Sequence, residues 1–380
     1  MFPMSIVTGL SGNEIYCTQR LGMTPGDLVI GNSVFSMGFL GSIASAARTL
    51  AGGEVTQVTS VIHEGRKLSL DRLLKEGQQR GGNAVTGVTS ELLWHGGSVE
   101  FLSVGSSLKH QDETLGNFST SSGGQELFCQ IDAGFRPIHF AFGNVAYSIG
   151  LGGGLGGFLQ SFARGEVTQF SEVFNKTRHL ALERIEADAK SFGANAVVGI
   201  RTSILPIMGT TEMLMIGTAS HHPALGPEFN DRPLTSHLTC QEMWNLIHLG
   251  YMPIRLVLGV SVYALGITGG ISAFFKGLSR GEVTQLTTLI YDARENAILQ
   301  IAKEADACGA DEVVGIKTFI SQLGSNMIEF MAVGTACKKM DGLKTISDQL
   351  PPQALVKDED TVIKPSIHSA FAAKNLNQGN

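Results

Sequence analysis

The sequence predicts an α+β protein made of three tandem units, each a β-α-β-β segment with an extra helix in front of it. The first observation is that the string Gly-Glu-Val-Thr-Gln occurs at 53–57, 165–169 and 281–285. The second is that other landmarks keep the same spacings of 112 and then 116 residues. Self-similarity at a fixed spacing indicates one structural unit used several times.

One of these landmarks is Asn83-Ala-Val-Thr-Gly-Val88, which matches 195–200 and 311–316. Polar, turn-rich stretches separate the matching segments and are typical of linkers. We therefore expect units at 5–110, 117–222 and 233–340, followed by a tail at 341–380 that is either loose or docked on a neighbouring unit.

Each unit is expected to open with a short helix. In the first and third units it begins with a capping-box pattern, Ser11 to Glu14 and Thr239 to Glu242, in which a hydroxyl and a glutamate bind free backbone N–H groups. A glycine at 22, 134 or 250 ends this helix. The first strand follows, at 27–35, 138–147 and 254–263, and leads into a glycine-rich apolar turn and a short helix such as 150–162.

A helix of about 25 residues is expected after each Gly-Glu-Val-Thr-Gln string. In the second unit Phe170, Val173, Phe174, Thr177, Ala181, Ile185, Ala189 and Phe192 recur at intervals of three and four. This pattern predicts one apolar helix face. The first unit has Gly65, Ser69 and Gly77 in this helix, and each glycine costs about 1 kcal/mol relative to alanine, so we expect its helix to be the weakest.

A hairpin is expected to close each unit, with strands at 196–204 and 212–219 in the second. A three-stranded sheet with one covering helix leaves unpaired strand edges, which are templates for further pairing. The units are therefore expected to pair with each other or with other chains.

These landmarks resemble the YbjQ family of small bacterial proteins, which are labelled as heavy-metal-binding. The segments that carry the resemblance are 193–200, 212–219 and the helix from Arg178 to Ile185, and it covers all three units. The resemblance implies a β-α-β-β fold similar to dodecin subunits and assembly into closed rings, typically pentameric. A triple array departs from the single unit of that family and suggests a specialised role in assembly.

Composition excludes several classes of protein. Charged residues are 16% of the chain, net charge is −6, and mean hydropathy is +0.13, which argues against a disordered chain and against a nucleic-acid binder that works by charge. The five cysteines form no C-x-x-C motif, and no secretory signal is recognised at the N-terminus. We therefore expect a cytoplasmic protein.

Metal-ligand candidates are weak. Cys17 and Cys129 are equivalent, but the third unit has Asn245 at that position, and a repeated metal site would repeat its ligand. His221 and His222 are adjacent, so on a strand they point to opposite faces. We expect these four residues to have packing or surface roles, and metal binding is the alternative interpretation. The glycine-rich turn at 150–157 lacks a phosphate-binding motif, and no cofactor is predicted.

Three sets of charged residues recur at equivalent positions in all units. A glutamate precedes the long helix, an arginine lies within it, and a glutamate begins a late strand. An Arg–Glu pair between helix and sheet, or across a subunit interface, would explain why both recur. We predict structural roles in assembly rather than acid–base catalysis. The three sets are Glu54, Glu166, Glu282; Arg66, Arg178, Arg294; and Glu100, Glu212, Glu329.

Two long segments are almost free of charge. Between Arg136 and Arg164 lie 27 residues with only His139 ionisable, and between Arg255 and Lys276 lie 20 uncharged residues. Their length suits a membrane span, but glycines split each into a strand half and a helix half. Burial between subunits is the favoured interpretation, with Leu155 and Phe274 as central interface positions.

The sequence thus predicts a non-enzymatic protein that self-assembles into a closed ring, barrel or cage, with other copies of itself as partners. Two alternatives stay open. One is heavy-metal binding or sensing by Cys17, Cys129 and nearby histidines. The other is an enzyme that uses a pair of the Arg178/Glu212 type in a pocket between units.

Overall fold

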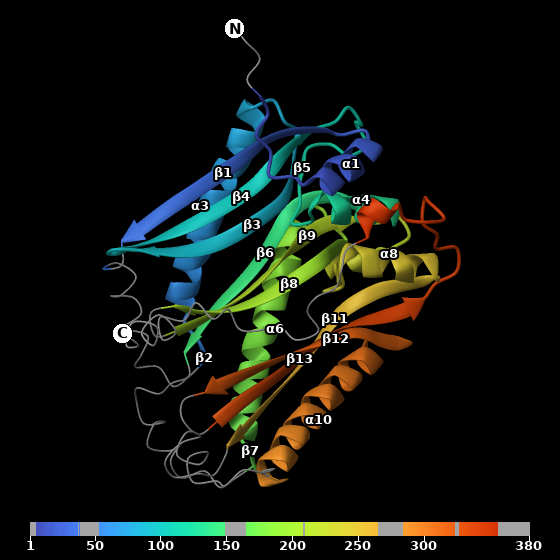
Figure 1. Ribbon diagram of the computed structural model, residues 1–380. Helices are drawn as coiled ribbons and strands as arrows, with labels where there is room; N and C mark the ends of the chain where they lie inside the picture. Colours follow the sequence, from blue (N-terminus) through green and yellow to red (C-terminus); the bar gives the residue numbers. More distant parts are fainter. Residues whose placement is uncertain are drawn as a thin grey trace.

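A computed structural model describes residues 5–36, 38, 53–148, 165–207, 210–264, 284–323 and 327–355 (Figure 1). Leu155, Phe274, Glu282 and the glycine-rich segments predicted as short helices lie outside the described residues. The three units follow one another in chain order from the top to the bottom of the view.

Each unit repeats the predicted order of helix, strand, helix, strand, strand, which confirms an α+β fold of three tandem units. The first unit consists of α1 (Gly12–Arg20), β1 (Thr24–Ser36), β2 (Gly53–Glu54), α3 (Thr56–Gln79), β3 (Ala84–His95) and β4 (Ser98–Lys109). The second consists of β5 (Phe118–Ser119), α4 (Gly124–Asp132), β6 (Arg136–Ser148), β7 (Gly165–Glu166), α6 (Thr168–Ser191), β8 (Ala196–Ile207) and β9 (Thr210–His221). The short helix α7 (Glu228–Asp231) lies between the second and third units. The third unit consists of β10 (Leu234–Thr235), α8 (Cys240–His248), β11 (Tyr251–Ala264), α10 (Thr284–Ala307), β12 (Glu312–Leu323) and β13 (Met327–Lys339), followed by the 3-10 helix η1 (Pro352–Ala354).

The units share their sheets. Each has a three-stranded antiparallel sheet, with orders β1-β4-β3, β8-β9-β6 and β12-β13-β11. Short strands from neighbouring units extend these sheets. Strands β5 and β10 add in parallel to β3 and β8 of the preceding unit, and strands β2 and β7 add antiparallel to β6 and β11 of the following unit. Units therefore cover part of each other's sheet edges, as those unpaired edges require.

Glycine lets each long helix approach the first strand of its own unit closely. A Cβ atom placed on Gly31 would lie 2.0 Å from the Ser69 carbonyl oxygen of α3, and Gly143 and Gly259 face α6 and α10 at 2.3 Å and 2.1 Å. No other residue fits this contact. The repeated glycine of the first strand thus sets the spacing between helix and sheet.

A second glycine makes a bulge near the start of the strand that follows the long helix, which is β3, β8 or β12. Gly87, Gly199 and Gly315 have φ of +65°, +63° and +65°, and the pairing register shifts at each of them. A glycine with positive φ forms such a bulge without strain. This explains the glycine in the repeated segment that begins at Asn83.

Details of the predicted helices need correction. Both capping boxes form, at Ser11 and Thr239. Val173 in α6 and Phe192, which follows the last residue of α6, are however exposed rather than part of the buried face. The hairpin strands of the second unit are also longer than expected, because β8 continues through Pro206.

The opening helices α1, α4 and α8 form a separate layer (Figure 1). Their buried residues share one apolar cluster with Leu350 and Ala354, so the part of the tail up to residue 355 docks on this layer. Asp132 anchors it, because its carboxylate accepts hydrogen bonds from Trp244 Nε1 at 2.7 Å and Ser347 Oγ at 2.6 Å. Among the described helices none has both the length and the apolar character to cross a membrane.

Candidate assembly interface

The chain contains two junctions of the same design. In the first, α3 of the first unit packs on β6 of the second, and in the second, α6 of the second unit packs on β11 of the third. A junction is here the contact between the long helix of one unit and the first and last strands of the next.

A buried ion pair lies at the centre of the first junction. Arg66 on α3 donates from Nε to Glu212 Oε1 at 3.0 Å and from Nη2 to Glu212 Oε2 at 2.6 Å, and both side chains are fully buried. The remaining guanidinium nitrogen donates to the carbonyl and hydroxyl oxygens of Ser90. Two parallel charge-assisted bonds of this kind fix both distance and orientation.

The second junction repeats the pair one unit later. Arg178 on α6 donates to Glu329 on β13, with Nη2–Oε1 at 2.7 Å and Nε–Oε1 at 3.1 Å. The guanidinium also donates to the Tyr147 hydroxyl at 2.6 Å and lies 4.2 Å from the centre of that ring. Burial raises the pKa of Tyr147 to about 12, so the hydroxyl stays protonated.

Both pairs cross from one unit to the next. Arg178 does not contact Glu212, the combination considered for an enzyme, because Glu212 belongs to Arg66. The Glu212 side chain is fully buried, and both of its oxygens accept hydrogen bonds from Arg66. The geometry therefore suits joining of units rather than acid–base chemistry.

The outer members of the two sets are placed differently. Arg294 on α10 is exposed and lies 5.7 Å from the centre of the Phe330 ring. Glu100 on β4 is partly exposed and accepts hydrogen bonds from Asn32 at 2.8 Å and His95 at 2.6 Å. The hydrogen bond from Asn32, and after it the one from His95, lowers the pKa of Glu100, so Glu100 is a carboxylate at neutral pH.

The glutamates before the long helices also lie near the junctions. Glu54 on β2 accepts from Arg184 Nη2 of the second unit at 2.7 Å. The backbone of Glu166 on β7 pairs with Tyr263 on β11.

Hydroxyl residues that the motif search passed over complete each junction. Thr59 Oγ1 accepts from the Ala146 N–H, and Ser171 Oγ accepts from the Val262 N–H, both at 2.9 Å. The sequence does indicate these positions, because a serine or threonine stands two residues after each Gly-Glu-Val-Thr-Gln string, at 59, 171 and 287.

The cysteines that were weak metal candidates lie in the opening-helix layer. Cys17, Cys129 and Cys240 are buried in the same apolar cluster. Burial raises the pKa of Cys17 to about 11 and of Cys129 to about 12, which disfavours the thiolate that binds metal. Sequence comparison of the units missed Cys240, because it begins α8 rather than lying at the equivalent position, 245.

His221 is the last residue of β9 and is partly exposed, whereas His222 follows the strand and is buried. The His222 ring lies 4.5 Å from that of Phe135, and its Nε2 lies 3.2 Å from the Ala133 carbonyl oxygen. Burial lowers the pKa of His222. Within the described residues, no three His, Cys, Asp or Glu side chains gather as a metal site would require.

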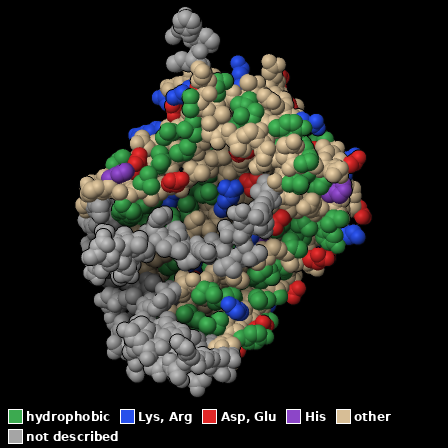
Figure 2. Space-filling view, in the orientation of Figure 1, with side chains coloured by type: hydrophobic (Ala, Val, Ile, Leu, Met, Phe, Trp, Pro, Cys, Tyr) green, Lys and Arg blue, Asp and Glu red, His purple; other side chains and the backbone are tan. Residues whose placement is uncertain are grey.

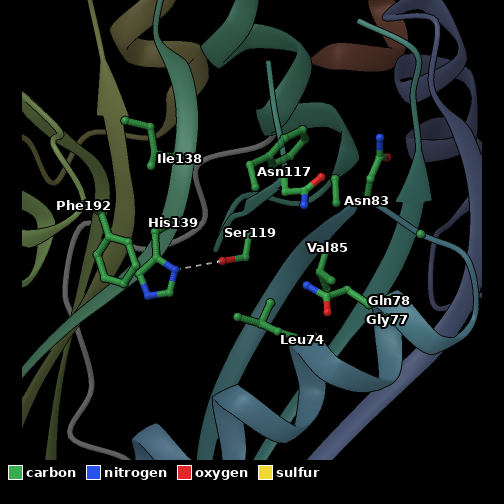
Figure 3. A pocket seen from close by; sticks show the side chains of 13 residues that line it. Leu74, Gly77, Gln78, Asn83, Val85, Asn117, Ser119, Ile138, His139 and Phe192 are labelled. Atoms are coloured by element: carbon green, nitrogen blue, oxygen red, sulfur yellow. Dashed lines mark hydrogen bonds between the residues drawn. The ribbon is translucent and has the colours of Figure 1, made fainter. Parts of the chain in front are cut away.

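A cavity of about 210 Å³ lies at the first junction, between α3, β5 and β6 (Figure 3). His139 Nδ1 lies 3.4 Å from Ser119 Oγ, and the imidazole stacks on Phe192 with ring centres 3.8 Å apart. Burial lowers the pKa of His139 to about 4, which makes it a weak base for activating the serine. Both stacked residues belong to the second unit, and we assign the His139–Phe192 stack to packing within that unit beside the cavity.

Comparison with known proteins agrees with the threefold repeat. A family model of YbjQ, described as "Putative heavy-metal-binding", matches residues 18–103, 136–222 and 252–340. The chain is similar to a protein of Mycobacterium tuberculosis named "Encapsulin nanocompartment protein", with 30% identity over 223 residues, which are 57% of this chain and 83% of that relative.

Single-unit relatives match as well. A UPF0145 protein of Pseudothermotoga lettingae is 40% identical over 85 residues, or 22% of this chain and 80% of the relative. One from Methanococcus maripaludis is 33% identical over 118 residues, or 30% of this chain and 99% of the relative. No solved structure gives a significant match. Since the three family matches together cover more than half of its length, the chain belongs to the YbjQ family.

Proposed function

We propose that this chain is a non-enzymatic cytoplasmic protein that assembles with copies of itself into a closed ring, barrel or cage. The observation that carries the proposal is the junction: the chain uses the same buried Arg–Glu contact twice to join its own units. A helix face that binds the strands of the following unit within one chain is suited to bind the equivalent strands of another chain.

The surface of the chain supports the same function. Large apolar side chains are exposed on the first and third units at β1, α10 and β12, including Ile30, Val34, Ile298, Ile316 and Ile320. Hydrophobic side chains also reach the surface over the first unit in the space-filling view (Figure 2). Exposed apolar groups of this kind mark sites of association.

The relative named as an encapsulin nanocompartment protein gives independent support for a role in a protein compartment. Its name points to a large assembly, either as the assembled particle or as a component of it. We favour assembly of this chain with itself, because the junctions show how its units already associate.

Mass photometry and negative-stain microscopy of the purified chain test the proposal. We expect uniform particles whose mass is a multiple of 40.4 kDa at micromolar concentration. A single 40.4 kDa species across that concentration range would refute self-assembly.

Heavy-metal binding is a second candidate because the family description names it. Elemental analysis of the same particles, together with Cys17→Ser and Cys129→Ser, separates the two functions. Stoichiometric metal that is lost in the serine variants would support metal binding. Particles that persist without metal would support a structural role alone.

A further inference from the structure

The two ends of the chain carry complementary halves of the same junction. We propose that the third unit of one chain binds the first unit of a second copy, with Arg294 of one copy paired to Glu100 of the next. The partner surface rests on the proposed self-assembly and specifies its contacts.

The first unit presents the receiving half of a junction. Ile30 on β1 is 49% exposed, whereas its equivalents Phe142 and Leu258 are 4% and 0% exposed under α3 and α6. Val34 is likewise exposed, and its equivalents in the second and third units are buried. Among the described residues, no helix therefore covers Ile30 and Val34 on this face of β1.

The third unit presents the other half. Ile298 on α10 is 37% exposed, whereas its equivalents Leu70 and Leu182 are 3% and 1% exposed. Leu70 packs with Phe140 and Phe142 of the second unit. Placed over β1 of another copy, Ile298 would reach Ile30 in the same way that Leu70 reaches Phe142.

The charges match the apolar faces. Arg66 and Arg178 are each bound by a glutamate of the following unit, but within the described residues Arg294 has no carboxylate within 4 Å. Glu100 has no arginine partner there and keeps only Asn32 and His95. One cation at one end and one anion at the other complete the series.

The sheet edges match as well. Strands β5 and β10 add to β3 and β8 at Ala84–Val85 and Ala196–Val197. The equivalent edge on β12 is Glu312–Val313, the outermost strand of the third sheet, and the residues equivalent to β5 are Ile6 and Val7. Both Ile6 and Val7 are exposed. Val7 already lies beside β1, where its carbonyl oxygen accepts from the Leu28 N–H at 2.6 Å.

A bulge contact gives a fourth point of agreement. The Val88 and Ile200 N–H groups donate to the carbonyl oxygens of Thr120 and Ser236 in the next unit, and both side chains are buried. Their equivalent Ile316 is 41% exposed. In the proposed contact its N–H would donate to the Thr8 carbonyl oxygen of the second copy. Such a head-to-tail contact closes into a ring when its rotation permits, and otherwise extends into a filament.

Charge reversal tests the pairing directly. Arg294→Glu and Glu100→Arg each place two like charges in the proposed contact, so each should convert the particles into 40.4 kDa chains at micromolar concentration. The double variant restores opposite charges and should restore the particles. Circular dichroism checks that each chain is folded, and Ile30→Asp tests the apolar face independently.

Lys303→Glu is the matched control. Lys303 is exposed on α10, and its equivalents Ala187 and Lys75 stay exposed at the internal junctions, so this reversal should leave the particles intact. If wild type assembles and both single reversals assemble equally well, the inference is wrong while self-assembly stands. If the reversals dissociate the particles but the double variant does not restore them, the Arg294–Glu100 pair is wrong. If wild type itself is a single chain, the proposed function fails.

Discussion

The two internal junctions have the same plan but different interiors. At the second, side chains of both units, such as Phe174, Leu182 and Leu258, belong to one continuous buried cluster. At the first, two separate and smaller clusters divide the contact, one around Ile62 and one around Leu70. The Arg–Glu pair is the part that both share.

The polar side chains that surround the Arg–Glu pair also differ between the two junctions. Position 139 at the first junction is a neutral histidine beside a cavity, whereas the equivalent Arg255 at the second forms a 3.3 Å ion pair with Glu186. The comparison shows that the ion pair and backbone contacts define the junction, while surrounding side chains vary. An intermolecular junction could therefore keep the pair with yet another interior.

The largest expected effect is loss of a buried charge partner. Arg178→Met leaves Glu329 buried without its guanidinium, and removal of one member of such a pair costs about 3–5 kcal/mol in free energy of unfolding. Arg178→Met with Glu329→Met should recover most of that loss, because no charge is left buried. Urea unfolding measures both; a single variant as stable as the double would contradict the assignment.

Acid should weaken the first junction through His139. The folded-state pKa of about 4 lies below the unfolded value of 6.5, so between these values the unfolded chain binds the extra proton. The free energy of unfolding therefore falls as pH decreases from 6.5 to 4, by on the order of 3 kcal/mol from this group.

His139→Phe should remove that pH dependence while keeping the stack on Phe192. Urea unfolding at pH 7 and pH 4.5 measures the change in free energy of unfolding for the wild type and for the variant. Subtracting one change from the other cancels the contribution of groups that both proteins share, such as Asp188, whose pKa is raised to about 6 by burial. An identical pH response in both proteins would rule out His139 as the acid-sensitive group.

Two glycines of α3 should respond differently to alanine. A Cβ on Gly65 would lie 2.4 Å from the Phe101 ring, and overpacking of this kind costs about 1–3 kcal/mol. On Gly77 it would lie 3.1 Å from Val85 Cγ2, so a small adjustment offsets most of the gain of about 1 kcal/mol in helix propensity. Thermal unfolding of Gly65→Ala and Gly77→Ala compares the two positions. Equal destabilisation by both variants would show that packing of the Phe101 ring does not require a glycine at 65.

The smallest effect is expected at His179, and with the opposite sign to His139. Burial lowers the pKa of His179, but its hydrogen bond to Glu304 of the third unit and the charge of that carboxylate outweigh burial and raise it overall. This stabilisation is present below pH 6.5 and is lost as pH rises through the folded-state pKa. His179→Gln should cost up to about 1 kcal/mol at pH 6 and less at pH 8.

The sequence predicted the repeat, the order of elements and the opening capping boxes, because spacing and local hydrogen bonding are written along the chain. It also indicated that Arg178 and Glu329 belong to recurring sets. It could not pair them across units, since Glu212 and Glu329 occupy equivalent positions and only the packing of α6 on β11 distinguishes them. The sequence also could not place Cys240 beside Cys17 and Cys129, because that contact forms only where helices from three units pack together.

Cryo-electron microscopy of the assembled particle tests the central claim most directly. We expect the Arg294 guanidinium of one chain within hydrogen-bonding distance of the Glu100 carboxylate of the next, with α10 lying across β1. A particle in which both side chains face solvent at every contact between chains would contradict the account.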